Sequence, residues 1–184
     1  MQTSSFQNPI VRQIADFLFS IGLPIRAAAL TLPTFLPGIL IDHGTLVVDE
    51  AQLHYPGDLL HEAGHLAVAA PSRRQFFYNN VGSDGGDEIA AIAWSYAAAL
   101  AIGLDPAVVF HADGYRGGAA AILDNFREGY YIGVPLLQWI GLSAEPRQAA
   151  ALGIPPYPHM RKWVRDVEDP AAAAVIADSA SSLP

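Results

Sequence analysis

Cysteine is absent from the sequence, and this absence excludes both disulfide bonds and thiolate metal ligands. Any metal ion would have to be held by His, Asp or Glu. Positive charge is also scarce, because 10 Lys and Arg stand against 18 Asp and Glu, for a net charge of −8. A nucleic-acid footprint needs clustered basic side chains, so we expect no nucleic-acid partner.

Long hydrophobic runs are missing as well. The best candidate near the N-terminus, residues 17–25, is too short to cross a bilayer and follows Arg12 and Asp16. It also lacks the basic start and the cleavage site of a secretory signal. We therefore expect no membrane span and a cytoplasmic location, and the sequence indicates no particular oligomeric state.

The composition that remains is that of a folded protein. Hydrophobic residues make up 52% and charged residues 15% of the 184 residues, which is enough for one sizeable core. We predict a single domain over 1–184 with three parts. An N-terminal helix and a proline-rich segment occupy 1–37, a central part spans 38–103, and a helical part that ends in a frayed tail spans 104–184.

Helical periodicity covers most of the chain. Apolar residues at helical spacing predict a first helix over 9–21, with Asn8 as its N-cap. Two longer helices are predicted over 56–70 and 87–102, the second with Asp87 as its N-cap and nearly apolar all round. Shorter helical pieces are predicted at 106–111, 117–129, 134–141 and 145–153.

A β-hairpin is predicted just before the second of these helices. Two β-rich runs, 39–41 and 45–48, flank the turn residues Asp42-His43-Gly44. Three prolines between 24 and 37 leave little regular structure there beyond a short helix at 25–30, and this apolar segment is a candidate partner surface. The predicted fold class is α+β, mainly α, with a small hairpin packed before the 56–70 helix.

The stretch DLLHEAGHLA, residues 58–67, is the part of the sequence that points to chemistry. His61 and His65 lie four residues apart, so on a helix they share one face and their imidazoles can converge on one tetrahedral cation. Glu62 can then reach a water molecule on the metal without being a ligand. Zinc lowers the pKa of bound water to about 7 and a glutamate can take its proton, so the pattern predicts metal-assisted hydrolysis.

A glycine inside this motif adds a packing signal. Gly64 stands in the middle of the helix, where glycine costs about 1 kcal/mol relative to alanine. We therefore expect a strand or another helix to lie close against that face of the helix.

The sequence HEAGH, with apolar residues on both sides, resembles the active-site helix of the zincin metallopeptidases. A hairpin that leads into this helix also resembles small bacterial zincin domains, and the resemblance covers 38–70 with the 85–102 helix as a second piece. It implies a zincin-like core in which His61 and His65 bind Zn²⁺ and Glu62 is the general base. The metzincin extension, a third His six residues after His65, is absent because position 71 is Pro.

The third ligand is the open question. In glutamate-type zincins it comes from a second helix beside the first, and the resemblance points here to Glu88. A carboxylate on an apolar, buried helix must be paired, neutral or metal-bound, although it could also stabilise the helix dipole. Two rivals stay open: His111, in a loop beside glycines, and Asp87, which fits an N-cap or an outer carboxylate better. Asp84 ranks below both.

Other side chains have weaker signals. His111 or Tyr115 could donate a hydrogen bond to the oxyanion of a tetrahedral intermediate, as a downstream His or Tyr commonly does in zincins. The remaining histidines, His43, His54 and His159, are expected to be structural or exposed. Core packing is the expected role of the large aromatic residues at helical positions, which are Trp94, Tyr96, Trp139 and Trp163.

Two functions fit these residues. The first is a zinc-dependent hydrolase that acts on a peptide or protein substrate, where the zincin resemblance supplies the peptide bond. The second is a non-catalytic module of the same fold that binds a metal or a partner, or acts as a sensor. An open position on the metal would favour the first function. Sites of two His and one Glu accept several divalent ions, so the choice of Zn²⁺ also follows from the resemblance.

Overall fold

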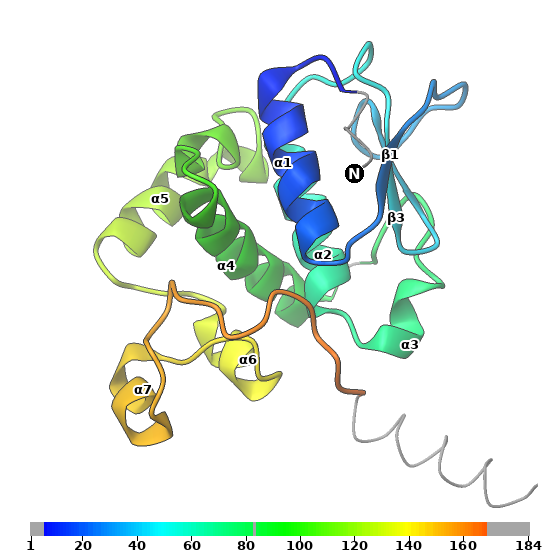
Figure 1. The fold of residues 1–184 in the computed structure, drawn as a ribbon. Helices are drawn as coiled ribbons and strands as arrows, with labels where there is room; N and C mark the ends of the chain where they lie inside the picture. Colours follow the sequence, from blue (N-terminus) through cyan, green and yellow to red (C-terminus); the bar gives the residue numbers. More distant parts are fainter. Residues whose placement is uncertain (1–5, 83, 169–184) are drawn as a thin grey trace, which may run out of the picture.

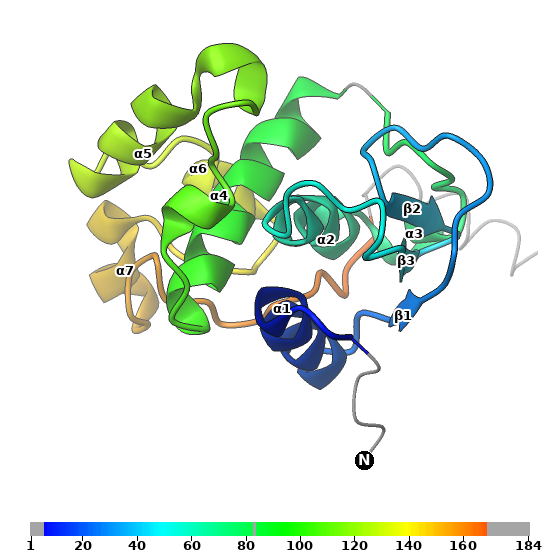
Figure 2. The same cartoon turned by 90° about the horizontal axis from the view of Figure 1, so that it is seen from above.

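The computed structural model describes residues 6–82 and 84–168. Figures 1 and 2 show helix α2 (Asp58–Val68) between helix α4 (Gly85–Ala101) and a small sheet, with α1 (Pro9–Ser20) alongside. The predicted class, α+β and mainly helical, is confirmed. The other elements are β1 (Ile25–Ala27), β2 (Ile39–Asp42), β3 (Thr45–Val48), α3 (Pro71–Arg74), α5 (Ala119–Arg127), α6 (Val134–Trp139), α7 (Pro146–Leu152) and the 3₁₀ turns η1 (Pro106–Val108) and η2 (Tyr115–Gly117).

The predicted hairpin is present as β2 and β3, which pair antiparallel with Ile39 opposite Val48. His43 and Gly44 form its two-residue turn, and both have a positive φ, of 50° and 87°. Turns of this kind match the right-handed twist of the strands, and glycine adopts them without strain. The hairpin could therefore be predicted from its turn residues alone.

The prediction of a short helix over 25–30 is wrong. Residues Ile25–Ala27 form β1, which pairs parallel with β3, so the strand order is β1-β3-β2. The backbone amide of Leu46 donates to the Pro24 carbonyl at 2.9 Å. This pairing joins segments that are distant in sequence, and it overrides the local preference of an alanine-rich stretch for a helix.

Helix α2 lies directly against α4. A Cβ atom added to Gly64 would come within 2.9 Å of the Ala91 carbonyl oxygen and 3.2 Å of the Ala91 Cα. The prediction that a neighbouring element occupies the space at Gly64 is confirmed. Helix α4 is buried along most of its length, as its nearly apolar sequence predicts.

Helix α4 begins earlier than predicted. Its N-cap is Asp84, whose Oδ1 atom accepts hydrogen bonds from the amides of Gly86 (2.7 Å) and Asp87 (3.1 Å). The prediction of Asp87 as N-cap is wrong, because the glycines that follow Asp84 are weak helix formers and hide the true start. Asp87 lies in the first turn instead, where it pairs with Arg73 at 3.0 Å.

Two arginines from later segments hold the C-terminal end of α2. The Arg74 guanidinium donates to the carbonyls of Leu66 (2.8 Å) and Ala69 (3.0 Å). The backbone amide of Arg165 donates to the Ala67 carbonyl at 2.8 Å. These bonds satisfy carbonyl groups that the last turn of a helix leaves without partners in the helix.

Residues 157–168 form a C-terminal strap, the orange segment that runs from α7 past α4 and α2 in Figure 1. The Trp94 indole donates to the Trp163 carbonyl at 2.7 Å. Glu168 accepts hydrogen bonds from the backbone amide and the hydroxyl of Ser72, at 3.0 and 2.6 Å. The strap therefore joins α4 to the start of α3.

Most of the remaining sequence expectations hold. The predicted α1 with its Asn8 cap is present, and the four short helical pieces appear as η1, α5, α6 and α7. Trp94 and Tyr96 are buried and Trp163 is half-buried, but Trp139 is 66% exposed because α6 ends at the surface there. The predicted frayed tail lies outside the described residues. Within the described ranges, every helix falls short of the length and apolar character that a bilayer crossing requires.

Candidate metal centre

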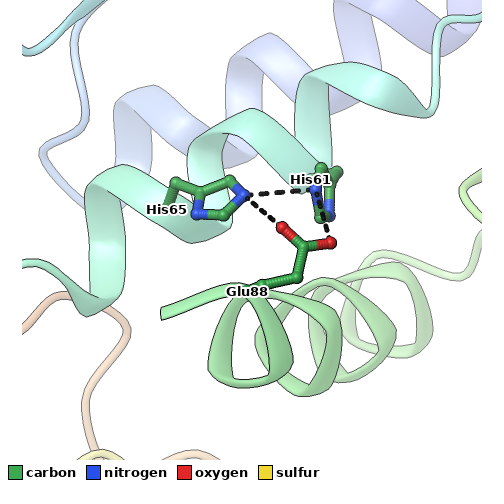
Figure 3. A group of neighbouring side chains, drawn as sticks. All are labelled: His61, His65 and Glu88. Atoms are coloured by element: carbon green, nitrogen blue, oxygen red, sulfur yellow. Dashed lines mark hydrogen bonds and ion pairs between the residues drawn. The ribbon is translucent and has the colours of Figure 1, made fainter. Parts of the chain in front are cut away.

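The three side chains predicted as metal ligands meet between α2 and α4 (Figure 3). The Nε2 atoms of His61 and His65 lie 3.2 Å apart. Glu88 places one carboxylate oxygen 3.6 Å from His61 Nε2 and the other 3.2 Å from His65 Nε2. Within residues 6–82 and 84–168, these side chains form a group whose ligand atoms gather closely enough to hold one metal ion.

The spacing of these atoms fits a tetrahedral ion. Zinc bonds to imidazole nitrogen and carboxylate oxygen are about 2.0–2.2 Å long, so ligand atoms at the corners of a tetrahedron lie about 3.3–3.6 Å apart. The two imidazole nitrogens lie 3.2 Å apart, and each has a different oxygen of the Glu88 carboxylate at 3.6 or 3.2 Å, while one ligand atom from each residue lies within 4.8 Å of the other two.

The electrostatics of the group favour metal ligation. Burial lowers the pKa of His61 to about 4, and the charge of His65 adds to this effect while Glu88 opposes it. His61 is therefore neutral at neutral pH, which is the form that binds a metal. The pKa of Glu88 is lowered, chiefly by the side-chain hydrogen bond from His65. Burial opposes this shift, and the charges of His61, His65 and Arg116 add to it.

Packing orients the two imidazole rings. Their Nδ1 atoms are buried and have no hydrogen-bond partner in the described part of the chain. The His61 ring packs edge-on against His65, with centroids 4.7 Å apart, and against Tyr115, with centroids 5.4 Å apart. Tyr115 therefore supports the ring of His61, a role that a hydrogen bond to Nδ1 performs in most metal sites.

Glu62 is buried on the same helix, with 6% of its surface exposed. Among the described residues its carboxyl group makes no hydrogen bond or ion pair. Burial raises the pKa of Glu62 to about 7; the charge of His65 opposes this shift, and those of Asp58 and Glu88 add to it. A carboxyl group that titrates near neutral pH can both accept and release a proton.

The hydroxyl of Tyr115 is buried beside the ligand group. It has no hydrogen-bond partner in the described ranges. Burial raises the pKa of Tyr115 above its usual value, with further contributions from the charges of Asp58, Glu88 and Glu62. The hydroxyl therefore keeps its proton at neutral pH and is available as a hydrogen-bond donor.

His111 lies outside the ligand group. Its Nε2 atom is 3.0 Å from Asp58 Oδ1, and its ring stacks on Tyr55 with centroids 3.7 Å apart. Burial raises the pKa of Asp58, and the bond from His111 opposes that shift. The structure therefore brings Glu88 to the two histidines of α2, and it brings His111 to the first turn of that helix.

The other sequence candidates also lie apart from the ligands. Asp84 caps α4, and Asp87 is paired with Arg73. His54 and His159 are exposed, as predicted, and His43 is exposed in the hairpin turn, where it lies 2.9 Å from Asp42.

Two residues of this region escaped the sequence interpretation. Asp58 is absent from the predicted site, although its position one turn before His61 and Glu62 places it on their side of α2. Arg116 had no signal in the sequence, because its charge lowers the pKa of Glu88 only through the way that the chain folds η2.

Comparisons of this chain with protein-family models, with curated proteins and with solved structures found no match. The geometry and the chemistry of the site therefore carry the functional conclusion.

Proposed function

We propose that this chain is a zinc-dependent hydrolase of peptide bonds with a zincin-like core, in which His61, His65 and Glu88 hold the ion and Glu62 is the general base. The observation that carries the proposal is the convergence of three ligand atoms from two helices, with a buried, unpaired glutamate next to the first ligand. The resemblance of HEAGH to the zincin active-site helix supplies the peptide bond as the substrate.

The donor set suits a catalytic zinc ion. Two imidazoles and one carboxylate are a combination found in catalytic sites, where the fourth position is left for water. The side chain of Glu88 is 45% exposed, against 14% for His61 and 6% for His65, so solvent reaches the group on the Glu88 side. When bound, zinc supplies a Lewis acid and lowers the pKa of a bound water to about 7.

Glu62 moves the proton in this proposal. In its ionised form it takes a proton from the attacking water as the new C–O bond forms. It then passes this proton to the nitrogen of the leaving amine as the C–N bond breaks. Burial raises the pKa of Glu62 in the ion-free site, which favours its taking up the proton.

Tyr115 is the donor that we assign to the oxyanion of the tetrahedral intermediate. Its hydroxyl is protonated, buried and without a partner in the described residues, and its ring contacts His61. His111 shared this role in the sequence interpretation, but its Nε2 atom is engaged with Asp58. A fixed donor in a water-poor site stabilises the developing negative charge more than water does.

The test is the substitution Glu62→Gln. We expect the variant to keep one zinc per chain and to lose hydrolysis of a peptide library by about 100-fold or more. Zinc is measured by elemental analysis and cleavage by mass spectrometry of the library. Glu128→Gln, at an exposed glutamate after α5, is the matched control and should retain both properties.

Each other outcome has a definite meaning. A wild-type chain that holds zinc but cleaves no peptide would be the metal-binding module of the alternative function. A wild-type chain that binds no zinc would contradict both the hydrolase and the metal-binding module. Hydrolysis that survives in Glu62→Gln would remove Glu62 as the base and leave the metal site standing.

A further inference from the structure

The turn η2 presents Tyr115 to the metal centre from a backbone conformation that side chains disfavour. Tyr115 has φ 54° and Arg116 has φ 52°, in the left-handed region where glycine is the usual residue. The Tyr115 ring lies against His61, with centroids 5.4 Å apart, and against Phe110, with centroids 5.1 Å apart. A conformation of this kind persists where the surrounding structure imposes it, so contacts outside the turn must hold Tyr115 in place.

These contacts begin at His111, just before the turn. The His111 Nε2 atom donates a hydrogen bond to Asp58 Oδ1 at 3.0 Å, and 14% of each side chain is exposed. His111 Nδ1 is buried and has no hydrogen-bond partner in the described ranges. Among the described residues, the bond to Asp58 is therefore the polar contact that fixes this ring.

Tyr55 adds a second anchor for the same segment. Its ring stacks on His111, with centroids 3.7 Å apart and an angle of 10° between the planes. Its hydroxyl donates to Asp113 Oδ2 at 2.5 Å. A Cβ atom at Gly114 would lie 3.2 Å from two atoms of the His111 ring, so the absence of a side chain there gives the ring its space.

The segment is attached to α2 at two points on one face of the helix. Asp58 stands three residues before His61, which places the two side chains one turn apart on the same side. His111 is bound at the first position, and Tyr115 packs at the second. The helix that carries the metal ligand therefore also carries the anchor of the segment that presents Tyr115.

We propose that the bond between Asp58 and His111 positions Tyr115 beside the metal centre, so that His111 is a positioning residue of the hydrolase. This inference rests on the proposed function, in which the Tyr115 hydroxyl donates to the oxyanion. His111 acts through Tyr115 and does not touch the substrate. An oxyanion donor must be held accurately, since a displacement of about 1 Å can reduce the rate by about 100-fold.

The first measurement needs neither zinc nor turnover. The tyrosines of the metal-free chain are labelled as 3-fluorotyrosine, and the fluorine NMR signal of Tyr115 is assigned by its loss in Tyr115→Phe. His111→Leu fills the space of the ring without a donor, so we expect the Tyr115 signal to shift toward that of the exposed Tyr130. His111→Gln keeps an N–H donor for Asp58 and should restore the wild-type signal.

Two controls separate positioning from general stability. Tyr157 is buried, and its hydroxyl donates to the Ala93 carbonyl of α4 at 2.9 Å, so its signal should stay unchanged in His111→Leu. His159→Ala, at an exposed histidine, should leave the signals of Tyr157 and Tyr115 unchanged.

A second variant acts on the other anchor of the segment. Tyr55→Phe keeps the ring stack on His111 and removes the hydroxyl that binds Asp113. It should shift the Tyr115 signal in the same direction as His111→Leu does. It also provides the test if His111→Leu fails to fold.

Zinc-loaded protein gives a kinetic signature of the same role. His111→Leu should keep one zinc per chain and lower kcat for peptide hydrolysis by about 10-fold or more, with little change in KM. The same substitution in Tyr115→Phe should cost no further activity, because the side chain that His111 positions has already lost its hydroxyl.

The outcomes separate the two proposals. A Tyr115 signal that does not move in His111→Leu, or that moves together with the Tyr157 signal, would overturn the positioning role and leave the hydrolase proposal intact. An equal loss of turnover with and without the Tyr115 hydroxyl would overturn that role as well. A shifted Tyr115 signal in a chain that binds no zinc would instead contradict the hydrolase and support the placement of Tyr115 by His111.

Discussion

Gly64 and Ala91 are in direct backbone contact, because a Cβ atom at Gly64 would lie 2.9 Å from the Ala91 carbonyl oxygen. The first prediction follows from this contact. Gly64→Ala should push α2 away from α4 and lower the free energy of unfolding by about 1–3 kcal/mol, although alanine is the better helix former. It should also weaken zinc binding, since His65 is the next residue on α2. Urea denaturation and calorimetric zinc titration measure the two effects.

Gly85→Ala is the control for this substitution. Gly85 is also a helical glycine, but a Cβ atom there would meet nothing within 4 Å. Its stability should stay level or rise slightly, because alanine restricts the unfolded chain. If Gly64→Ala were equally harmless, the close approach of the two helices would not be what positions the ligands.

The second prediction concerns the third ligand. Glu88→Gln keeps the shape of the side chain but removes its charge, so we expect zinc affinity to fall by more than about 100-fold, which exceeds the usual cost of losing an outer partner of a ligand. Calorimetry gives the affinity, and the rise in melting temperature on adding zinc gives a second readout. That rise should be present in the wild type and absent in the variant.

Asp87→Asn is the neighbouring control. Asp87 precedes Glu88 but is paired with Arg73, so its loss should leave zinc affinity within a few-fold of the wild type. His111→Ala should behave likewise, because His111 lies against Asp58. A variant of either residue that lost zinc while Glu88→Gln retained it would assign the third ligand to that residue.

The third prediction is a pH dependence of the metal-free protein, prepared with a chelator. Burial raises the pKa of Glu62 to about 7, from an ordinary value of 4.5. A group whose pKa is raised by folding contributes stability that is fully present below its unfolded pKa and is lost as the pH rises through the folded one. The free energy of unfolding should therefore fall between pH 4.5 and 7, by at most about 3 kcal/mol from this group.

The variant Glu62→Gln isolates the contribution of Glu62 to this pH dependence of stability. The variant retains His61 and every other titrating group, so the difference between its stability and that of the wild type reports Glu62 alone. We expect the wild type to lose stability relative to the variant across this pH range in urea denaturation series. A difference that stays constant with pH would show that the carboxyl group is hydrated in the metal-free protein.

The fourth prediction separates structure from catalysis at Tyr115. Its hydroxyl has no hydrogen-bond partner within residues 6–82 and 84–168, so Tyr115→Phe should leave the free energy of unfolding unchanged or raise it by up to about 1 kcal/mol. Peptide turnover should fall by about 100-fold with zinc retained, because an oxyanion donor is lost. Unchanged turnover would limit Tyr115 to packing against His61.

The part of this site that could be predicted from sequence is the part that is local. The period of one helix predicts the placement of His61, Glu62 and His65. Gly64 indicated a closely packed neighbouring element, because glycine is costly in the middle of a helix. The hairpin was readable from its turn residues. Glu88 required a second helix to be placed beside the first, and it was the resemblance to zincins that supplied this placement.

What could not be predicted depends on contacts between distant segments. Residues 25–27 look helical by composition but pair with β3. Asp87 was predicted as the N-cap of α4, but Gly85 and Gly86 belong to this helix and Asp84 is its N-cap. His111 lies against Asp58, and Tyr115 and Arg116 belong to a turn whose positive φ angles no local pattern predicts.

The C-terminal strap affects the order in which parts of this protein become stable during synthesis. The last turn of α2 receives a hydrogen bond from Arg165, which is synthesised long after His61 and His65. A growing chain on the ribosome would thus carry two metal ligands on a helix whose end has its bonds from Arg74 but still lacks the one from Arg165. We expect the end of α2 to become rigid only once the strap has emerged, so that partly made chains hold a metal ion less firmly than the whole chain does.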